Sequence, residues 1–211
     1  MQVTDIENML KIIFTLLFFV SINAQAGIVY NAIKATPQVA MSRDSTGVTS
    51  CGVRVMTLVE VGDETTWHDF SGSVYRDGIF GLWKAGSYRY ATAKLLKKIP
   101  APGTSIRLPA PTGFWIAEAG ASSAASMQKV IPAEDKGFIL GDADVVNTMN
   151  TVLAIAKGSP IQFAMQYKDE KVERIVSFSA PLNDADYSTL LRCFEGLQAG
   201  IASDNPGIDK E

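Results

Sequence analysis

The residue types that could perform chemistry are few, and the single histidine limits them most. A Ser-His-Asp or Cys-His catalytic set would have to use His68 as its base. Alternation places His68 on the same side of an expected strand as Phe70 and Val74, which favours a partly buried strand histidine. An alternative stays open, in which His68 and a nearby aspartate activate Ser71 or Ser73 of a hydrolase.

Two other patterns contain catalytic residue types. Ser126-Met127-Gln128-Lys129 matches Ser-x-x-Lys, in which a lysine one helical turn away deprotonates a serine. The companion Ser-Asp-Asn and Lys-Thr-Gly motifs are absent from the sequence, so we interpret the match as chance. Four aspartates could supply a glycosidase carboxylate pair, but capping of two expected helices accounts for all four. These are Asp142, Asp144, Asp184 and Asp186. We therefore expect no catalytic residues and a protein that is not an enzyme.

Metal and cofactor sites are not indicated either. A His-based zinc site draws on several histidines or cysteines, and the chain has one histidine and two cysteines. The sequence contains no Gly-x-Ser-x-Gly, no phosphate-binding glycine loop and no EF-hand calcium loop. We expect no metal and no cofactor.

The first 26 residues are typical of a signal peptide. Lys11 precedes an apolar run from Ile12 to Val20, and Ala24-Gln25-Ala26 supplies small residues at the −3 and −1 positions. We expect cleavage before Gly27 and a location in the periplasm or outside the cell; whether translation starts at Met1 or at Met9 stays open. The apolar run is shorter than the roughly 20 residues of a membrane span, and the mature chain has no longer run.

Export predicts one disulfide between the two cysteines, Cys51 and Cys193, because such compartments are oxidising. The alternative is a redox pair, which usually has the form Cys-x-x-Cys. Neither cysteine has such a neighbour, so the structural disulfide is favoured.

Hydrophobic spacing predicts an α+β domain, a mostly antiparallel β-sheet or sandwich with two helices late in the chain. From 142 to 200 the spacing reads as helix, hairpin, helix, with the helices ending at Gly158 and Gly200. Alternation predicts the other strands, Asp77-Gly78 a hairpin turn, Ala85-Gly86 a bulge, and Pro37 with 42–47 a turn or loop. The expected strands are 27–34, 51–61, 67–76, 79–94, 106–108, 114–118 and 138–140, and 119–126 is expected to be a loop. We expect a single domain over 27–200 and a disordered tail over 201–211.

The charge excludes one class of partner and the aromatic residues suggest another. The net charge is −3 and the only basic cluster is Lys94, Lys97 and Lys98, so we expect no nucleic acid. Seven aromatic residues lie on the expected sheet, and those on its exposed side could form a partner surface. Of these we single out Trp83 and Tyr88.

The C-terminal third also resembles a known family. An expected helix ends in Ala154-Ile155-Ala156-Lys157-Gly158, a strand runs from Ile161 to Tyr167, and Val176-Ser177-Phe178-Ser179 precedes a final leucine-containing helix. Over about residues 138–197 this order resembles the invasion-associated locus B family of exported bacterial proteins. The two cysteines do not fall where that family has its early cysteines, and the N-terminal half has no counterpart. The resemblance implies a small, virulence-associated periplasmic β-rich domain without a cofactor, and no functional residue is transferred.

Together these patterns favour a non-enzymatic exported domain that binds another envelope or secreted protein. It would be an accessory of an envelope or secretion system, or an inhibitor or immunity-type protein. Two alternatives stay open, namely a small-ligand carrier and a hydrolase that depends on His68.

Overall fold

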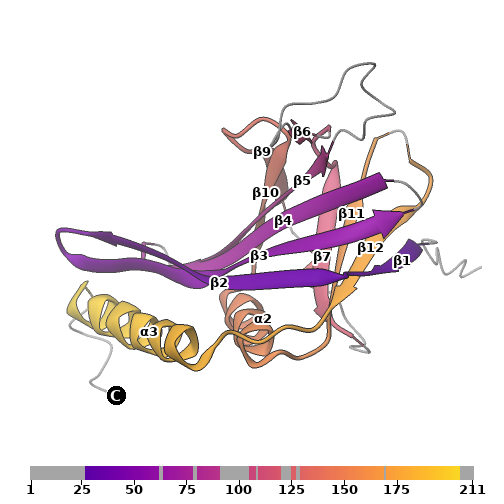
Figure 1. Ribbon diagram of the computed structural model, residues 1–211. Helices are drawn as coiled ribbons and strands as arrows, with labels where there is room; N and C mark the ends of the chain where they lie inside the picture. The colour runs from indigo at the N-terminus through magenta and orange to yellow at the C-terminus, as the bar shows by residue number, and fades with distance from the viewer. Residues whose placement is uncertain are drawn as a thin grey trace, which may run out of the picture.

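In the part of the chain that the structure describes, the fold consists of two β-sheets and two helices (Figure 1). The structure is a computed structural model and describes residues 27–61, 64–77, 80–90, 105–107, 109–119, 125–126, 129–168 and 170–204. Within these ranges the large sheet has the strand order β2-β3-β4-β5-β10-β9, with β6 paired to β5, and the small sheet has the order β1-β12-β11-β7-β8. The strands are β1 Gly27–Asn31, β2 Lys34–Asp44, β3 Gly47–Val61, β4 Glu64–Tyr75, β5 Phe80–Tyr90, β6 Ser105–Arg107, β7 Gly113–Glu118, β8 Ala125–Ser126, β9 Lys129–Pro132, β10 Phe138–Ala143, β11 Ile161–Gln166 and β12 Glu173–Phe178.

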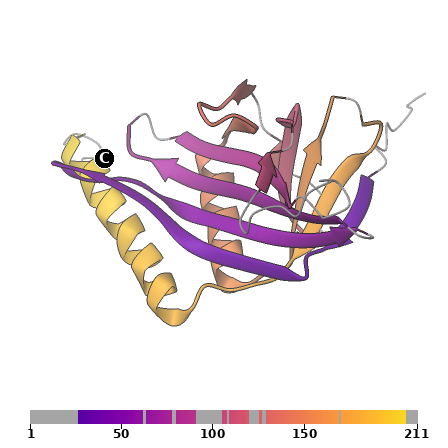
Figure 2. The same ribbon diagram turned by 45° about the horizontal axis from the view of Figure 1, so that its top comes forward.

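The large sheet is built on β3, whose alternation follows from its β-branched residues. Cys51, Val53 and Val55 are fully buried on the inner side, whereas Arg54 on the other side is exposed. Strands β2 to β5 pair antiparallel in sequence order. Figure 2 shows that these long, bent strands extend from the small sheet at one end to α3 (Asp184–Asp204) at the other.

The small sheet covers one end of this inner face. Its pairing is antiparallel except for β1, which runs parallel to β12. Phe70 of β4 stacks on Phe163 of β11, with ring centroids 4.4 Å apart, and Phe178 of β12 completes the group. These contacts join the two sheets into one sandwich-like hydrophobic core.

The two helices cover the rest of the inner face. Helix α2 (Val145–Lys157) buries Val152, Ile155 and Ala156, which are spaced three and four residues apart, against β3, β4 and β5. Helix α3 packs against β3, where Cys193 forms a disulfide with Cys51 and the two Cα atoms are 5.8 Å apart. The predicted α+β fold with its late helices and its disulfide is thus confirmed.

Several local predictions were wrong. The predicted loop around Pro37 is strand β2, and only Ser45 and Thr46 form a turn. Pro37 is tolerated because β2 is an edge strand, where a missing N–H leaves no central ladder incomplete. The register of β4 with β5 is continuous at Gly86, so the predicted bulge is absent there. A Cβ at Gly86 would lie 2.6 Å from the Phe138 ring, and this close packing explains the glycine.

The end of the chain also differs from expectation. Helix α3 continues past Gly200 to Asp204, into the predicted tail. Other predictions lie outside the described residues, namely the signal peptide 1–26, the turn residue Gly78, the lysine cluster 94–98 and most of the loop 119–126. Within the described ranges, neither helix is both long enough and apolar enough to cross a membrane.

Candidate functional site

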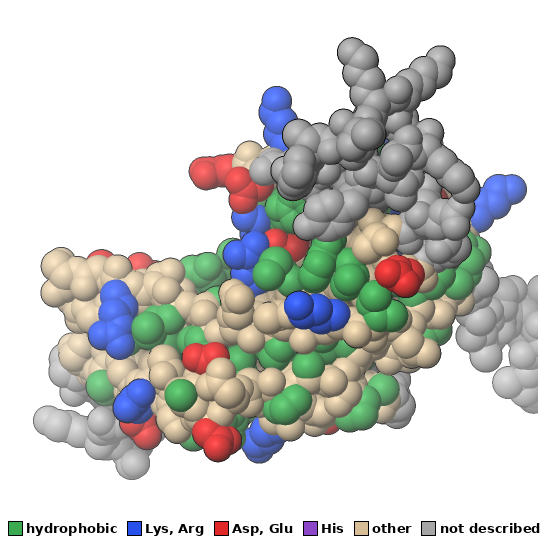
Figure 3. Space-filling view, viewed as in Figure 1, with side chains coloured by type: hydrophobic (Ala, Val, Ile, Leu, Met, Phe, Trp, Pro, Cys, Tyr) green, Lys and Arg blue, Asp and Glu red, His purple; other side chains and the backbone are tan. Residues whose placement is uncertain are grey.

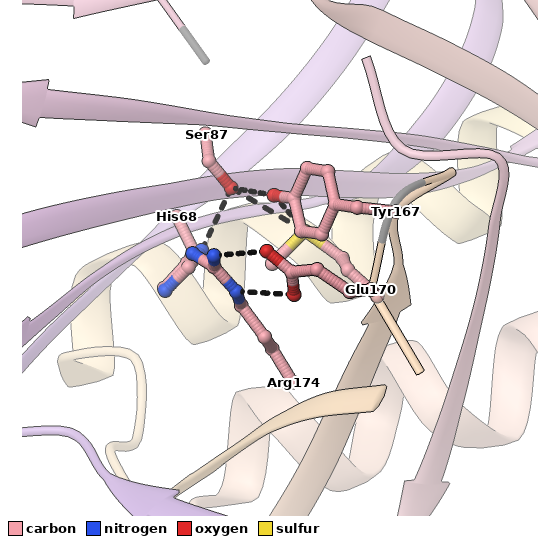
Figure 4. Close-up of polar contacts among 6 residues, drawn as sticks. His68, Ser87, Tyr167, Glu170 and Arg174 are labelled. Carbon is pink, nitrogen blue, oxygen red and sulfur yellow. Dashed lines mark hydrogen bonds and ion pairs between the residues drawn. The ribbon is translucent and has the colours of Figure 1, made fainter. Parts of the chain in front are cut away.

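His68 belongs to a hydrogen-bond network between the two sheets (Figure 4). His68 of β4 and Ser87 of β5 are direct cross-strand neighbours, and His68 Nδ1 lies 2.7 Å from Ser87 Oγ. Ser87 Oγ also shares a hydrogen bond of 2.9 Å with the hydroxyl of Tyr167, which follows β11, and donates to Met165 Sδ at 3.4 Å. The network therefore connects the large sheet to the small one.

This network is closed to solvent. His68 is 3% exposed and Ser87 is 1% exposed. Burial, and to a smaller extent the positive charge of Arg174, lowers the pKa of His68 to about 3. Arg174 itself is paired with Glu170 and lies over the ring of Tyr167. An imidazole with so low a pKa is a poor general base near neutral pH, where catalysis favours a pKa close to the working pH.

The serines predicted as nucleophiles do not reach His68. Successive side chains of a strand point to opposite faces, so Ser71 and Ser73 lie on the other side of β4 from His68. The hydrolase hypothesis is therefore wrong in its proposed partners. The serine that His68 contacts is Ser87, which was not among the predicted nucleophiles.

Trp83 is likewise not part of a surface. It is fully buried on the inner face of β5, over Gly72, where a Cβ would lie 2.5 Å from its ring. Its Nε1 donates a hydrogen bond to Thr148 Oγ1 of α2 at 3.2 Å. Trp83 and Tyr88 have opposite parity along β5, so they cannot share one face of the sheet. Only Tyr88, which is half-buried, lies on the outer face.

The outer face of the large sheet, the side away from the small sheet and the helices, contains an open hollow of about 240 Å³. Figure 3 shows basic and acidic side chains close together on this face among hydrophobic ones. The hollow is lined by Arg54, Asp69, Ser71, Lys84, Tyr88, Asp135 and Phe138. We call these residues the outer hollow.

Two hydrogen bonds of the outer hollow join Arg54 to Asp69. Asp69 accepts a hydrogen bond from Arg54 Nε at 2.9 Å and another from Nη2 at 2.5 Å. The Asp69 side chain is only 8% exposed, whereas that of Arg54 is 49% exposed. The hydrogen bond to Asp69 raises the pKa of Arg54, which therefore stays charged. A nearly buried carboxylate thus orients a half-exposed guanidinium, and Nη1 takes no part in the pair.

A second cation, Lys84, lies two strands away from Arg54. Arg54 of β3, Ser71 of β4 and Lys84 of β5 are successive cross-strand neighbours, so their side chains form one row on the outer face. Lys84 forms an ion pair with Asp135, in the loop between β9 and β10. The Lys84 ammonium also lies 4.9 Å from the centre of the Phe138 ring.

Aromatic and apolar side chains continue from the row of polar ones. Tyr88 packs on Phe138, with ring centroids 5.5 Å apart. Trp67, its cross-strand neighbour, is half-buried on the same face, as are Leu58 and Met56 of β3. The outer hollow therefore adjoins an amphipathic surface rather than a purely charged one.

The aspartates at the predicted helix starts have three different roles. Asp144 is the N-cap of α2 and accepts a hydrogen bond from the N–H of Asn147 at 2.9 Å. In α3 the cap is Asn183, which accepts from the N–H of Asp186, while Asp184 and Asp186 lie in the first turn. Asp142 is a strand residue of β10, so its predicted capping role is wrong.

Two other kinds of site considered from the sequence remain, the Ser-x-x-Lys match and a metal site. Met127 and Gln128 of the Ser-x-x-Lys match lie outside the described residues. Among the residues that are described, no three His, Cys, Asp or Glu side chains gather as a metal site would require.

Comparisons with known proteins give no further guide to this site. No protein-family model, no curated protein and no solved structure matches the chain. The resemblance of residues 138–197 to the invasion-associated locus B family stays a prediction from the sequence.

The sequence predicts Tyr88 of the outer hollow as a surface residue, whereas Arg54, Lys84 and Asp135 were not predicted as site residues. The parity of β3 and β5 could have placed Arg54, Lys84 and Tyr88 on one face. Asp135 had no such signal, because it follows β9, a strand that the sequence did not predict.

Proposed function

We propose that the chain is a non-enzymatic protein-binding domain of the periplasm, which attaches to another envelope or secreted protein through the outer face of its large sheet. Its partner would be a component of an envelope or secretion system, or a protein that it inhibits. The signal-peptide pattern of residues 1–26 supports export, and the Cys51–Cys193 disulfide suits an oxidising compartment.

The observation on which this proposal depends is the outer hollow. Arg54, its half-exposed cation, is oriented before any partner arrives, because the nearly buried Asp69 holds its guanidinium by two hydrogen bonds. Preorganised side chains lose less conformational freedom on binding, and arginine and tyrosine are enriched among the residues that dominate protein interfaces. The half-buried Trp67, Leu58 and Met56 beside them supply apolar contact area.

Site-specific photo-crosslinking tests this proposal. A benzophenone amino acid is placed at Ser71, in the outer hollow, or at Gln38, an exposed outer-face residue of β2. The matched control is Asn150, exposed on α2 on the other side of the sheet. Irradiation of cells of the native host should give one discrete protein adduct from the two outer-face positions and none from Asn150.

Absence of a protein adduct at both outer-face positions would reject the proposal. The small-ligand carrier that the sequence leaves open would then be the better hypothesis. A ligand present at 100 times its dissociation constant would raise the free energy of unfolding by roughly 2.7 kcal/mol, which a thermal-shift screen detects.

A further inference from the structure

The geometry points to the group that the outer hollow receives: a carboxylate side chain from an acidic peptide segment of the partner. It would bind along the row of Arg54, Ser71 and Lys84, in competition with Asp135. That this carboxylate belongs to a protein segment rests on the function proposed above. The chemistry of the site rests on its own geometry.

The donors of this row suit a carboxylate. Arg54 turns two of its nitrogen atoms towards Asp69, and Nη1 with its two N–H donors is left on the half-exposed side chain. Ser71 adds a hydroxyl between the two cations, and Lys84 adds an ammonium. Hydrogen bonds from charged donors to a carboxylate are among the stronger ones in proteins, and a guanidinium that is held in place loses little freedom in forming them.

The protein itself places a carboxylate at this position. Asp135 reaches Lys84 from the loop between β9 and β10, and its side chain is 56% exposed. Exposed ion pairs are weak because both groups remain well solvated in the unpaired state. A carboxylate from a partner can therefore replace Asp135 at Lys84, and Asp135 acts as an internal competitor that lowers the affinity of the site.

The size of the outer hollow favours a single side chain over a complete small molecule. Its volume of about 240 Å³ lies below the roughly 300–1,000 Å³ of typical small-molecule pockets. The rest of a bound segment would lie over Trp67, Leu58 and Met56, which are half-buried on the same face. The chain has a net charge of −3, so long-range attraction does not favour an acidic partner and recognition depends on this local row.

Titration calorimetry with defined peptides tests the inference on the full chain purified from the periplasm of an expression host. The probe is an acetylated and amidated hexaglutamate peptide, and hexaglutamine is its uncharged match. We expect Lys84→Gln to weaken hexaglutamate binding about tenfold. Asp135→Asn should strengthen it about threefold, because the internal competitor is lost. Lys157→Gln, at the exposed end of α2, removes a lysine elsewhere and should leave the affinity unchanged.

Arg54 needs a paired variant, because its removal alone would leave Asp69 nearly buried without its cation. The double variant Arg54→Gln, Asp69→Asn avoids this and should also weaken binding about tenfold. Opposite effects at Lys84 and Asp135 cannot arise from unfolding, which would weaken binding in both variants.

Three results would overturn the inference. They are equal binding of hexaglutamate and hexaglutamine, no gain from Asp135→Asn, and binding of free N-acetylglutamate as tight as that of the peptide, which would assign the site to small acids. Failure of the proposed function is a separate result. If the peptides bind as expected but Ser71 and Gln38 give no protein adduct, only the proposed function is rejected. If the adduct persists in Lys84→Gln and the peptides do not bind, only this inference is rejected.

Discussion

At the scale of single residues, His68, Ser87 and Tyr167 form a polar group within the interior of the sandwich. Each of these side chains has a hydrogen-bond partner, which compensates for the loss of water on burial. Because His68 and Ser87 belong to the large sheet and Tyr167 follows a strand of the small sheet, the network fixes the position of one sheet against the other. It also makes the fold sensitive to acid.

The first prediction concerns this sensitivity. The pKa of His68 is about 3 in the folded protein and close to 6.5 in an unfolded chain. Between these values the unfolded state binds more protons than the folded state. The contribution of His68 to the free energy of unfolding is therefore fully present above pH 6.5 and is lost as the pH decreases towards 3. His68 alone should lower the free energy of unfolding by about 2 kcal/mol between pH 7.5 and pH 5.

Urea denaturation at the two pH values measures this change. His68→Asn provides the comparison: the variant is less stable at pH 7.5 but should lose about 2 kcal/mol less than the native chain on acidification. Equal losses in the two proteins would show that His68 does not titrate with a lowered pKa.

The second prediction contrasts the two aromatic residues of β5. Trp83→Ala empties a fully buried site and leaves Thr148 without its donor, so it should lower the free energy of unfolding by about 3–5 kcal/mol. Tyr88→Ala, on the half-buried outer face, should lower it by about 1 kcal/mol. Chemical denaturation of both variants measures the difference, and similar losses would contradict the assignment of the two residues to opposite faces.

At the scale of elements, local capping residues mark the start of both helices and the end of α2. Helix α2 starts at the cap Asp144 and stops at Gly158, whose φ of 79° is in the left-handed region that glycine adopts without strain. Helix α3 starts at the cap Asn183, whose side chain also donates to Asp186. These signals set where α2 begins and ends and where α3 begins, whereas the position of each helix on the sheet is decided by its buried face.

The third prediction tests the cap of α2. Asp144→Ala removes the acceptor for the N–H of Asn147 and should lower the free energy of unfolding by about 1 kcal/mol. Asp142→Ala removes the same charge two residues earlier, from an exposed strand position, and should change it by less than about 0.5 kcal/mol. If Asp142→Ala destabilised the protein as much as Asp144→Ala, charge rather than capping would be responsible.

At the scale of the whole molecule, α3 contributes Leu190 to the main core and is also attached to the large sheet by a small second cluster and one covalent bond. Cys51 and Val74 of the sheet pack with Cys193 and Leu197 of the helix, apart from the main core. The disulfide joins residues 142 positions apart, so it restricts much of the unfolded chain.

The fourth prediction follows from this attachment. The double variant Cys51→Ala, Cys193→Ala should lower the free energy of unfolding by up to about 5 kcal/mol, the chain-entropy value for so long a loop. Thermal unfolding of the oxidised chain, the reduced chain and the double variant measures the loss. The reduced chain should resemble the variant, and an oxidised chain no more stable than the variant would contradict a stabilising role.

Much of the architecture follows from local patterns. Alternation in β3 and the apolar spacing of α2 identify these elements, because pleated strands and helices each present one face to a core at a fixed period. The single pair of cysteines allows one intramolecular disulfide, and the export pattern favours its formation. Strand β2 was missed because Pro37 is a loop signal except at a sheet edge, and edge position is a property of the assembled sheet.

The residues of the outer hollow could be brought together only with the tertiary structure. Arg54, Ser71 and Lys84 are far apart along the chain and become neighbours only through the register of β3, β4 and β5. Asp135 reaches Lys84 because β9 and β10 extend the same sheet, and Ser87 meets Tyr167 because two sheets pack face to face. The sequence by itself therefore determined many of the element types and the disulfide, which depend on local spacing or composition, and it predicts an export signal on the same kind of pattern. The composition of the outer hollow and of the buried network was decided by strand order and sheet packing, which only the folded chain defines.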